Sequence, residues 1–460
     1  ATVLRRAARR GRRSMVAVTP RSALLAGVAI GAAAAVALPA LLRHLRGAAA
    51  QKGTHAVRAG ASVRIPRGEL TEVVAACLQA AGATAAHAQA SAEVLVFADC
   101  RGIPSHGVNR ADFYAAELEE KLVDGAAEPV VAVDSGCCAL VDGRNALGAV
   151  VSRRAMELAV SKARAHGVGW VVCKGSNHFG AAGYWAEQAA REHLLAFSFT
   201  NTAPFMVPTG GRTRAVGTNP ICCFAPGAAG ESFQLDMATT TVPIGKVEVM
   251  ARLGKPLPVG WGVDGAGEAS SDAATVGGEG GLTPLGGLEE TAGYKGYGLG
   301  MLVEILCAVL SGARRVGPGV QPWTVPRETG PNDFGHCFVV LDPARLGGGL
   351  GFEDRLAAYL ATMRALPGSV QVPGDPEKAH EAEAAAHGVA LHPNVAAAVK
   401  ALALRWSVAL PKSFDGIDAT MAAQNMYVRK DELQHREQSR RQSRSLSGSF
   451  FFFFAKVVGC

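Results

Sequence analysis

The stretch "VVCKGSNHFGAAGYW", residues 171–185, is the one on which the fold prediction depends. It opens with an apolar run typical of a buried strand, and the residues from Tyr184 onward have the pattern of a helix. The glycine-rich turn between them carries His178. Functional groups often project from turns at strand ends, although a loop histidine can also be merely solvated. The stretch predicts a strand, a turn presenting His178, and a helix.

Apolar runs and helical patterns alternate on both sides of this stretch, which predicts an α/β or mixed α+β fold. Strand-like runs lie near 130–141, 168–173, 194–201, 219–225 and 336–342. Helical patterns cover 68–102 as two helices, 149–166 and 296–312. The P-loop motif G-x-x-x-x-G-K-[ST], the motif G-x-S-x-G and the motif H-E-x-x-H are missing from the sequence, the Gly-rich "GYKGYGLG" lacks the G-x-G-x-x-G spacing, and no such spacing follows a strand-like run and opens a helical pattern. Any nucleotide cofactor must therefore be held by something other than a Rossmann turn.

A second polar segment, "RGIPSHGVNRADFY" at 101–114, precedes the central stretch. Pro104 ends the element before it, and Ser105 is suited to cap a new helix. On that helix His106, Arg110 and Tyr114 would share one face. The planar fork of an arginine makes two parallel hydrogen bonds to a carboxylate, so this face suits a carboxylate ligand. The alternative is a surface arginine beside a capping serine.

A third polar segment follows at 199–224 and continues to 246. It places Asn201, Thr202 and Asn219 around tight turns, and Asp236 stands before a run of three threonines. Hydroxyls and amides in such numbers need hydrogen-bond partners, which a polar ligand would supply. Ordinary turn capping is the alternative.

Charge is distributed unevenly along the 460 residues. Residues 1–60 hold eleven Lys and Arg and no acid, whereas residues 61–411 hold 27 basic and 34 acidic side chains. A nucleic-acid-binding protein would carry its basic patch on the folded body, so this function class is disfavoured. Cysteines occur without a C-x-x-C pair, and the adjacent pairs Cys137–Cys138 and Cys222–Cys223 are expected to be reduced core residues. No metal site is expected.

Both ends of the chain differ from its body. The Arg-rich start and the twenty uncharged residues 23–42 fit either an organellar presequence or a membrane anchor. A presequence for an organellar matrix, mitochondrial or plastid, is favoured over a cytoplasmic or membrane-anchored location. The polar tail from 412, which ends near five phenylalanines, is expected to be disordered.

Six motifs occur in one order: "SHGVNRADFY", "GSNHFGAAGYWAEQAA", "TNTAPFMVPTGGRTRAVGTNP", "DMATTTVPIGKVE", "YKGYGLGMLVEILCAVLSGA" and "GHCFVVLD". From about residue 62 to 410 the chain resembles the malate/L-lactate dehydrogenase family that is distinct from the Rossmann-type enzymes. The resemblance implies a non-Rossmann NAD(P)-binding domain with a mixed, largely antiparallel sheet. It also implies a helical domain built from the N- and C-terminal parts of the body, and a homodimer.

Composition at the two ends and the resemblance in the body together predict a division of the chain. Its parts are 1–60, presequence or anchor; 61–135, helical part with the active-site helix; 136–370, sheet domain; 371–411, helices returning to the helical part; and 412–460, tail.

The family also implies roles for particular residues. His106, Arg110 and Tyr114 match its active-site helix, and His178 matches the histidine of its S-N-H-F-G turn. The implied NAD or NADP contacts are Thr202, Asp236, Met237, Ala238, Thr239, Thr240, Tyr294, Lys295, Gly335 and His336.

Hydride transfer from a 2-hydroxy acid such as malate or L-lactate releases a hydroxyl proton, and a histidine is suited to accept it. We expect His178 to exchange this proton, alone or paired with His106, and Arg110 to bind the substrate carboxylate. The alternatives are a reductase of cyclic imino acids (ketimines) and, in another class, a membrane-tethered scaffold without activity. Sequence alone does not separate NAD from NADP.

Overall fold

The structure is a computed structural model, and it describes residues 62–252, 254–322, 330–347 and 351–424. The predicted presequence or anchor and the last 36 residues of the predicted tail lie outside these ranges. Residues 412–424 are described: they form the 3₁₀ turns Lys412–Phe414 and Ala419–Gln424, and Phe414 is buried among the helices. Among the described residues no helix combines the length and apolar character that a membrane crossing requires.

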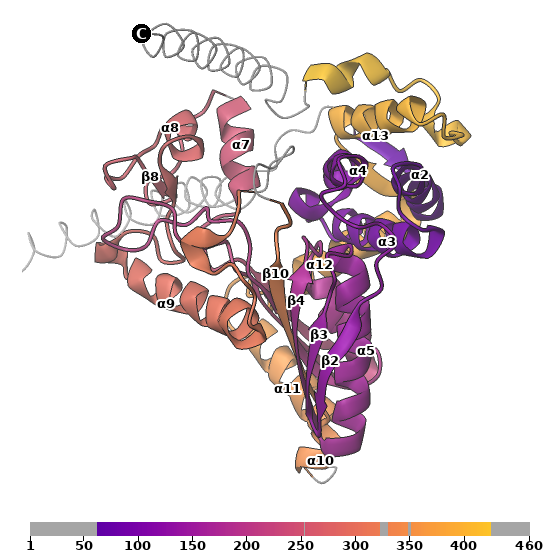
Figure 1. The fold of residues 1–460 in the computed structure, drawn as a ribbon. Coiled ribbons are helices and arrows are strands. Elements are labelled where there is room, and N and C mark those ends of the chain that lie inside the picture. Colours follow the sequence, from indigo (N-terminus) through magenta and orange to yellow (C-terminus); the bar gives the residue numbers. More distant parts are fainter. Residues whose placement is uncertain (1–61, 253, 323–329, 348–350, 425–460) are drawn as a thin grey trace, which may run out of the picture. The chain divides into compact units, whose positions relative to one another are not determined.

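Seven strands form the central sheet in the order β2-β3-β4-β10-β5-β6-β7 (Figure 1). They are β2 (Val130–Ser135), β3 (Cys138–Asp142), β4 (Val168–Ser176), β5 (Leu195–Thr200), β6 (Ile221–Pro226), β7 (Ser232–Met237) and β10 (Phe334–Leu341). β3 runs parallel to β4, and the other neighbouring pairs of this sheet are antiparallel. The predicted mixed, largely antiparallel sheet is confirmed.

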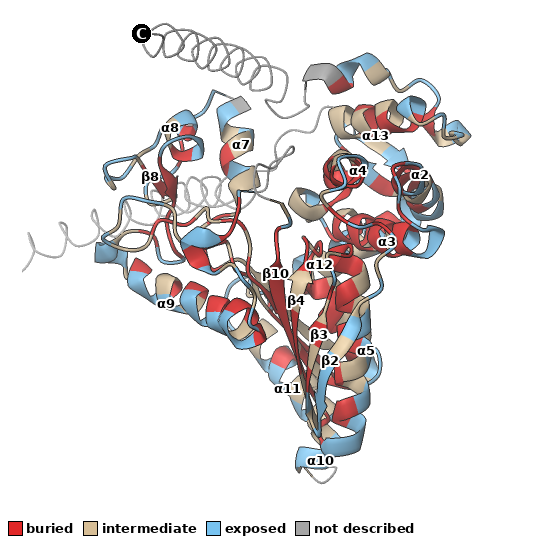
Figure 2. Ribbon diagram, viewed as in Figure 1, coloured by how far each residue is buried: buried red, intermediate tan, exposed pale blue. Residues whose placement is uncertain are grey.

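Helices cover both faces of this sheet. α5 (Gly148–His166) and α6 (Ala182–Ala190) bury their apolar sides against one face, in a core that includes Trp185 and Phe338. α9 (Gly293–Glu304) and the π-helical turn Ile305–Val309 cover the other face, through Val303 and Cys307. The middle strand β10 is accordingly buried between the layers, whereas the edge strand β2 is exposed (Figure 2). The predicted helices 149–166 and 296–312 correspond to these elements.

Two stretches of sheet differ from the prediction. The strand-like run near 130–141 is a hairpin, because Gly136 takes a positive φ of 52° and turns the chain between β2 and β3. The prediction that both cysteine pairs lie in the core is wrong for this hairpin: Cys137 is half-buried and Cys138 is exposed. β7 was not predicted, because this edge strand is half-buried throughout and lacks an apolar run.

A helical core joins the two ends of the described chain. It contains α2 (Arg67–Ala80), α3 (Ala85–Cys100), α4 (Ala111–Glu119) and α13 (Pro393–Arg405). β1 (Val63–Ile65) pairs antiparallel with β11 (Val389–Leu391) beside them. The helical part made from N- and C-terminal segments is therefore present. A smaller apolar cluster contains α7 (Ile244–Arg252), α8 (Ala273–Gly277), β8 (Gly262–Val263) and β9 (Gly281–Leu282).

The strand register brings distant segments to one edge of the sheet. The end of β4 lies beside the start of β10, where Phe334 pairs with Ser176. The start of β10 also lies beside the end of β5, and β6 begins where β7 ends, with Ile221 opposite Met237. The turns that carry the polar segments 176–181, 200–220 and 236–241 thus share this edge.

Candidate active site

The turn after β4 is held by contacts of Asn177, the residue before His178. Asn177 is buried, and its Nδ2 donates to the carbonyl oxygen of Ala146 at 2.9 Å and to Asn145 Oδ1 at 3.1 Å. The first residue of α5, Gly148, packs so closely that a Cβ there would lie 2.3 Å from the Asn177 oxygen. These contacts fix the backbone from which the His178 side chain projects.

The second polar segment is not the continuous helix that its spacing predicts. Residues Pro104–His106 and Val108–Arg110 form two 3₁₀ turns, and α4 begins only at Ala111. The break occurs at Gly107, where Asp99 of α3 approaches: its Oδ2 accepts the Val108 N–H at 2.7 Å. A Cβ at position 107 would lie 2.1 Å from Asp99 Oδ1, so only glycine fits beside this carboxyl group. Ser105 bonds the His106 ring instead of capping a helix.

Both segments nevertheless meet at His178. The imidazole rings of His106 and His178 are stacked, with centroids 5.6 Å apart and planes inclined by 16°. The Tyr114 hydroxyl lies 2.7 Å from His178 Nδ1. Arg110 is buried, its Nε donates to the Ser105 oxygen at 2.9 Å, and its charge acts on both histidines. The structure therefore brings together all four residues predicted to be catalytic.

Tyr114 fixes the orientation of the His178 ring. Its hydroxyl lies 2.7 Å from His178 Nδ1 and 3.2 Å from the His178 carbonyl oxygen. The Gly180 N–H lies 3.4 Å from the same Nδ1. These contacts engage Nδ1 and hold the plane of the imidazole.

Electrostatics keep both histidines neutral at pH 7. Loss of water around the ring, and secondarily the charge of Arg110, lower the pKa of His106 to about 4. The pKa of His178 is lowered well below 6.5, chiefly by burial and then by His106, Arg110 and His336. Burial also raises the pKa of the Tyr114 hydroxyl, so it remains protonated. A neutral imidazole has one unprotonated ring nitrogen, which can accept a proton.

The residues predicted to contact the cofactor begin at the same edge of the sheet. Thr202 follows β5; its N–H donates to Asn219 Oδ1 at 3.1 Å. Asp236 and Met237 end β7, and Ala238 follows; all three are half-buried. Asp236 Oδ2 accepts the Gly183 N–H at 2.7 Å in the first turn of α6, and burial raises the pKa of this carboxyl to about 6.

Other predicted contact residues are enclosed by the protein. Thr239 and Thr240 are buried, and their hydroxyls donate to backbone oxygens of residues 218, 219 and 242. Gly335 and His336 are buried in β10. The His336 ring bonds Thr200 Oγ1 at 2.8 Å and Ser176 Oγ at 2.7 Å, and it stacks on Phe179.

Tyr294 and Lys295 are exposed in the first turn of α9, with Lys295 Nζ 6.0 Å from the Tyr294 ring centre. Leu285 connects their helix with Thr239. The Leu285 N–H donates to the Thr239 oxygen, and the Leu285 backbone packs against Gly296 of α9. The half-buried groups at 202 and 236–238 lie at the same edge of the sheet as the turn of His178 and are suited to bond a polar ligand. Among the described residues no group of three or more His, Cys, Asp or Glu side chains is placed to hold a metal ion.

Sequence reasoning missed two buried acids near the site. Asp99 shapes the turn at Gly107, and burial raises its pKa to about 7. Glu304 is buried in α9 and accepts hydrogen bonds from Asn201 Nδ2 (3.0 Å), Asn219 Nδ2 (2.8 Å) and the Gly317 N–H (2.8 Å). The acid inside the apolar run "MLVEILC" was an available signal, since a buried carboxylate needs several donors. Asp99 gave no comparable signal.

The contact between Tyr114 and His178 predicts the effect of Tyr114→Phe. The variant removes the hydroxyl that binds Nδ1 while the ring packing remains, so kcat is expected to fall on the order of tenfold. Cofactor binding and the melting temperature should stay close to wild type. Steady-state kinetics together with cofactor titration measure both. An unchanged kcat would show that Tyr114 does not orient His178 for catalysis.

Comparison with known families gives one clear match. The model of the malate/L-lactate dehydrogenase family matches residues 65–400. A malate dehydrogenase of Pyrococcus abyssi is 43% identical over 251 residues, which cover 54% of this chain and 69% of the relative. A Δ1-pyrroline-2-carboxylate/Δ1-piperideine-2-carboxylate reductase of Pseudomonas syringae pv. tomato is 34% identical over 298 residues, covering 63% and 82%.

Solved structures agree with these matches. The crystal structure of malate dehydrogenase from Entamoeba histolytica superposes with a TM-score of 0.71 at 26% identity. It covers 76% of this chain and 99% of that one.

Proposed function

Since the chain belongs to the malate/L-lactate dehydrogenase family, we propose that its substrate is malate or a lactate-like 2-hydroxy acid. The protein is an oxidoreductase that moves a hydride between a 2-hydroxy acid and a nicotinamide cofactor. The proposal extends this activity to particular residues. Its substrate preference is supported by the relative named malate dehydrogenase and by the arginine beside the two histidines.

His178 takes the hydroxyl proton through Nε2 when the 2-hydroxy acid is oxidised, and returns it when the 2-oxo acid is reduced. The Tyr114 hydroxyl binds the other ring nitrogen, Nδ1, at 2.7 Å, and this contact, which fixes the orientation of the ring, is the observation that carries the assignment. Arg110 binds the substrate carboxylate, because its guanidinium is buried and always charged. His106, stacked on His178, orients the substrate.

The nicotinamide ring supplies the hydride acceptor or donor when the cofactor is bound. Thr202 and the segment Asp236–Thr240 hold it, with Tyr294, Lys295, Gly335 and His336 as further contacts. The enclosed Thr239, Thr240 and His336 act by fixing the backbone around it, since their side chains bond within the protein. NAD and NADP are both assigned as candidate cofactors.

A substrate panel tests the proposal. L-Malate, L-lactate and other 2-hydroxy acids are offered to the protein with NAD⁺ and with NADP⁺, and the corresponding 2-oxo acids with the reduced cofactors. Reduced nicotinamide is followed by its absorbance. We expect turnover of malate or a lactate-like acid with at least one cofactor. Absence of turnover with all of them would overturn the proposed substrate class.

The same panel separates a second candidate, reduction of cyclic imino acids. One relative is named as a reductase of this kind, which is the observation that favours it. Such a substrate has the same carboxylate but takes the hydride on the imine carbon and the proton on the imine nitrogen. Addition of a cyclic imino acid to the panel decides between them: the reductase is favoured if kcat/KM for the imine exceeds that for every 2-oxo acid.

The depressed pKa of His178 predicts the pH dependence of oxidation. The ring must be neutral to accept a proton, and in the free enzyme it stays neutral below its ordinary pKa of about 6.5. The acid limb of kcat/KM against pH should therefore lie below pH 6.5 in the oxidation direction. A profile measured with hydroxy acid and oxidised cofactor tests this. An acid limb at pH 7 or above would contradict the lowered pKa.

We also propose a homodimer formed through α9. Met301, Leu302, Ile305, Val309 and Leu310 are exposed along this helix and the π-helical turn that continues it. Adjacent exposed apolar side chains of this kind usually mark an interface, and a two-fold axis lets one face pair with itself. Light scattering should give twice the chain mass for the wild type and the single mass for Ile305→Asp/Val309→Asp. A monomeric wild type at micromolar concentration would exclude the dimer.

A further inference from the structure

Arg101 is a buried arginine at the end of α3, with 2% of its side chain exposed. Its Nη1 donates to Glu381 of α12 (Asp375–His387) at 3.0 Å, and its Nη2 donates to Gln234 Oε1 on β7. The guanidinium also lies over the rings of Phe97 and Phe224, 5.2 Å and 5.7 Å from their centres. One planar group thus joins a helix end, an edge strand and a second helix.

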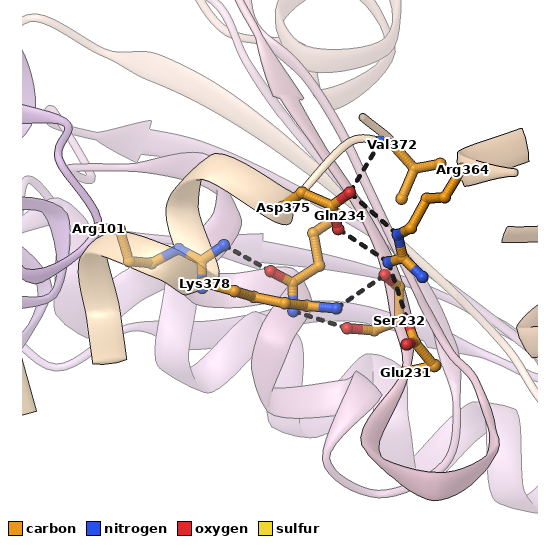
Figure 3. Close-up of polar contacts among 8 residues, drawn as sticks. All are labelled: Arg101, Glu231, Ser232, Gln234, Arg364, Val372, Asp375 and Lys378. Atoms are coloured by element: carbon orange, nitrogen blue, oxygen red, sulfur yellow. Dashed lines mark hydrogen bonds and ion pairs between the residues drawn. The ribbon is translucent and has the colours of Figure 1, made fainter. Parts of the chain in front are cut away.

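Gln234 is itself held on its far side (Figure 3). Its Nε2 donates to Ser232 Oγ at 3.0 Å, and its backbone N–H donates to the Pro373 oxygen at 3.0 Å. Lys378 of α12 donates to the Ser232 oxygen at 3.1 Å. Both partners of the Arg101–Gln234 bond are held by further hydrogen bonds. The bond therefore fixes the end of α3 relative to β7.

The chain continues from each end of this bond into a segment of the site. After Arg101 it enters residues 102–110, which carry His106 and Arg110. Gly102, at the start, packs on the ring of His380 of α12, 2.6 Å from where a Cβ would stand. After Gln234 the chain enters Asp236–Thr240, the segment assigned to the cofactor.

We propose that Arg101 is a positioning residue, which sets the placement of the substrate-binding turn relative to the cofactor segment through its bond to Gln234. The proposal rests on the proposed function of those two segments. Hydride transfer depends steeply on the distance between the reacting carbon atoms, and misplacement by about 1 Å can cost 10²-fold in rate. A lysine at 101 would keep the charge but lacks the planar fork whose two arms reach Glu381 and Gln234 in fixed directions.

Arg364 provides a matched control within the same network (Figure 3). Its Nε and Nη2 bond Asp375 at 3.0 and 2.8 Å, and Nη2 also bonds Glu231 at 2.9 Å. It connects the end of α11 (Phe352–Arg364) with α12 and the turn before β7. Neither of its acceptors leads directly into a segment assigned to substrate or cofactor. Loss of this arginine should therefore affect stability and leave the site aligned.

The experiment compares Arg101→Lys, Gln234→Leu, Gln234→Glu and Arg364→Lys. Arg101→Lys and Gln234→Leu should lower kcat about tenfold or more, with KM changed little and the pH profile retained. Gln234→Glu keeps an acceptor for Arg101 and should retain most of kcat. Arg364→Lys should lower the melting temperature with kcat unchanged. If Arg101→Lys does not fold, Gln234→Leu is compared with Arg364→Lys in its place.

Amide hydrogen exchange gives a readout that does not depend on activity. Exchange should accelerate in both 102–110 and 234–240 for Arg101→Lys and Gln234→Leu, and in neither for Arg364→Lys. Wild-type exchange in both segments overturns the positioning role, as does wild-type kcat in the folded variants. A wild-type protein that turns over no 2-hydroxy acid refutes the proposed function instead, and the exchange result still decides the placement.

A second inference stands on a different observation, the pair Cys137–Cys138 at the tip of the β2–β3 hairpin. Their sulfur atoms lie 3.8 Å apart, on a half-buried and an exposed residue. Ser135 pairs with Cys138 across the turn, so Gly136 and Cys137 are its two central residues, and Gly136 has the positive φ that such turns require. Lys162 fastens the turn by donating to the Gly136 oxygen at 2.8 Å.

The pair Cys222–Cys223 shows why the turn matters. Both residues lie within β6, where successive side chains point to opposite faces of the sheet. Cys222 is fully buried beneath α5 and α6, and Cys223 is half-buried. Of the two adjacent pairs, the hairpin pair alone presents both sulfur atoms together at the surface.

We infer that Cys137 and Cys138 form a binding site for a thiophilic centre with two exchangeable positions, such as a trivalent arsenical. In the reaction an arsenoxide, RAs=O, condenses with two thiols: two As–S bonds form, and the oxygen leaves with both thiol protons as water. Arsenic stays trivalent. A disulfide is disfavoured, because its S–S bond is about 2.05 Å and its usual Cα separation of about 4.4 Å or more exceeds the 3.8 Å of neighbouring residues.

Phenylarsine oxide is the probe, with native mass spectrometry as the measurement. The folded wild type and Cys223→Ser should each gain one phenylarsenic group with loss of one water, reversed by 2,3-dimercaptopropanol. Cys137→Ser and Cys138→Ser should each abolish the stable adduct, since one thiol remains. Equal adducts in both single variants, or no adduct in the wild type, would overturn the site.

Discussion

His178→Asn is expected to lose most turnover, about 10²–10⁴-fold in kcat, while the nicotinamide cofactor still binds. Asparagine keeps a hydrogen-bonding group at the end of β4 but accepts no proton at neutral pH. The surrounding turn is held by Asn177 and Gly148, so the fold should survive the change. Steady-state kinetics give kcat, and nicotinamide fluorescence gives the dissociation constant of the cofactor.

His106→Asn is the matched control for this prediction. It removes the ring stacked on His178 but leaves the Tyr114–His178 bond in place. The rate should fall less and should keep an acid limb, because the titrating group remains. The roles are reversed if His106→Asn loses the acid limb and His178→Asn keeps it. If both variants keep it, neither histidine exchanges the proton.

Arg110→Lys is expected to lower kcat/KM on the order of tenfold or more for every carboxylate substrate. A planar fork that can bond both carboxylate oxygens is replaced by a point charge. Loss of the Nε bond to the Ser105 oxygen also loosens the turn that carries His106. Arg153→Lys serves as control, since its ion pair with Glu93 lies on the surface, where a charge pair contributes little.

Measurements with a substrate series sharpen the assignment. An uncharged analogue in which an amide replaces the carboxylate should react poorly with the wild type, and Arg110→Lys should lower its rate much less. If Arg110→Lys matches the wild type on every carboxylate, the substrate carboxylate is bound elsewhere.

The sequence predicted the strands that are buried on both faces. β4, β5 and β10 are apolar runs between helical layers, so composition alone indicates them. β7 was missed, because this edge strand mixes Gln234 and Asp236 with apolar residues and therefore contains no continuous apolar run. The hairpin at Gly136 was also missed, because a single glycine in a strand-like run gave no clear sign that the run is two strands.

The candidate site was predicted in its residues and not in its geometry. The spacing of His106, Arg110 and Tyr114 indicated one helical face, yet the chain breaks at Gly107 because Asp99 approaches from α3. Local pattern carries no information on such a tertiary contact. The stacking of His106 on His178 and the bond from Arg101 to Gln234 likewise join segments far apart in sequence.

Transfer of deuterium from a C2-deuterated 2-hydroxy acid tests the central claim most directly. The protein is incubated with the labelled acid and oxidised cofactor, and the reduced nicotinamide is analysed by NMR and mass spectrometry. The account predicts one deuterium at C4 of the nicotinamide, none released to water, and almost no label transferred by His178→Asn. Label found in water, or no reduced cofactor with any 2-hydroxy acid and either NAD⁺ or NADP⁺, would contradict it.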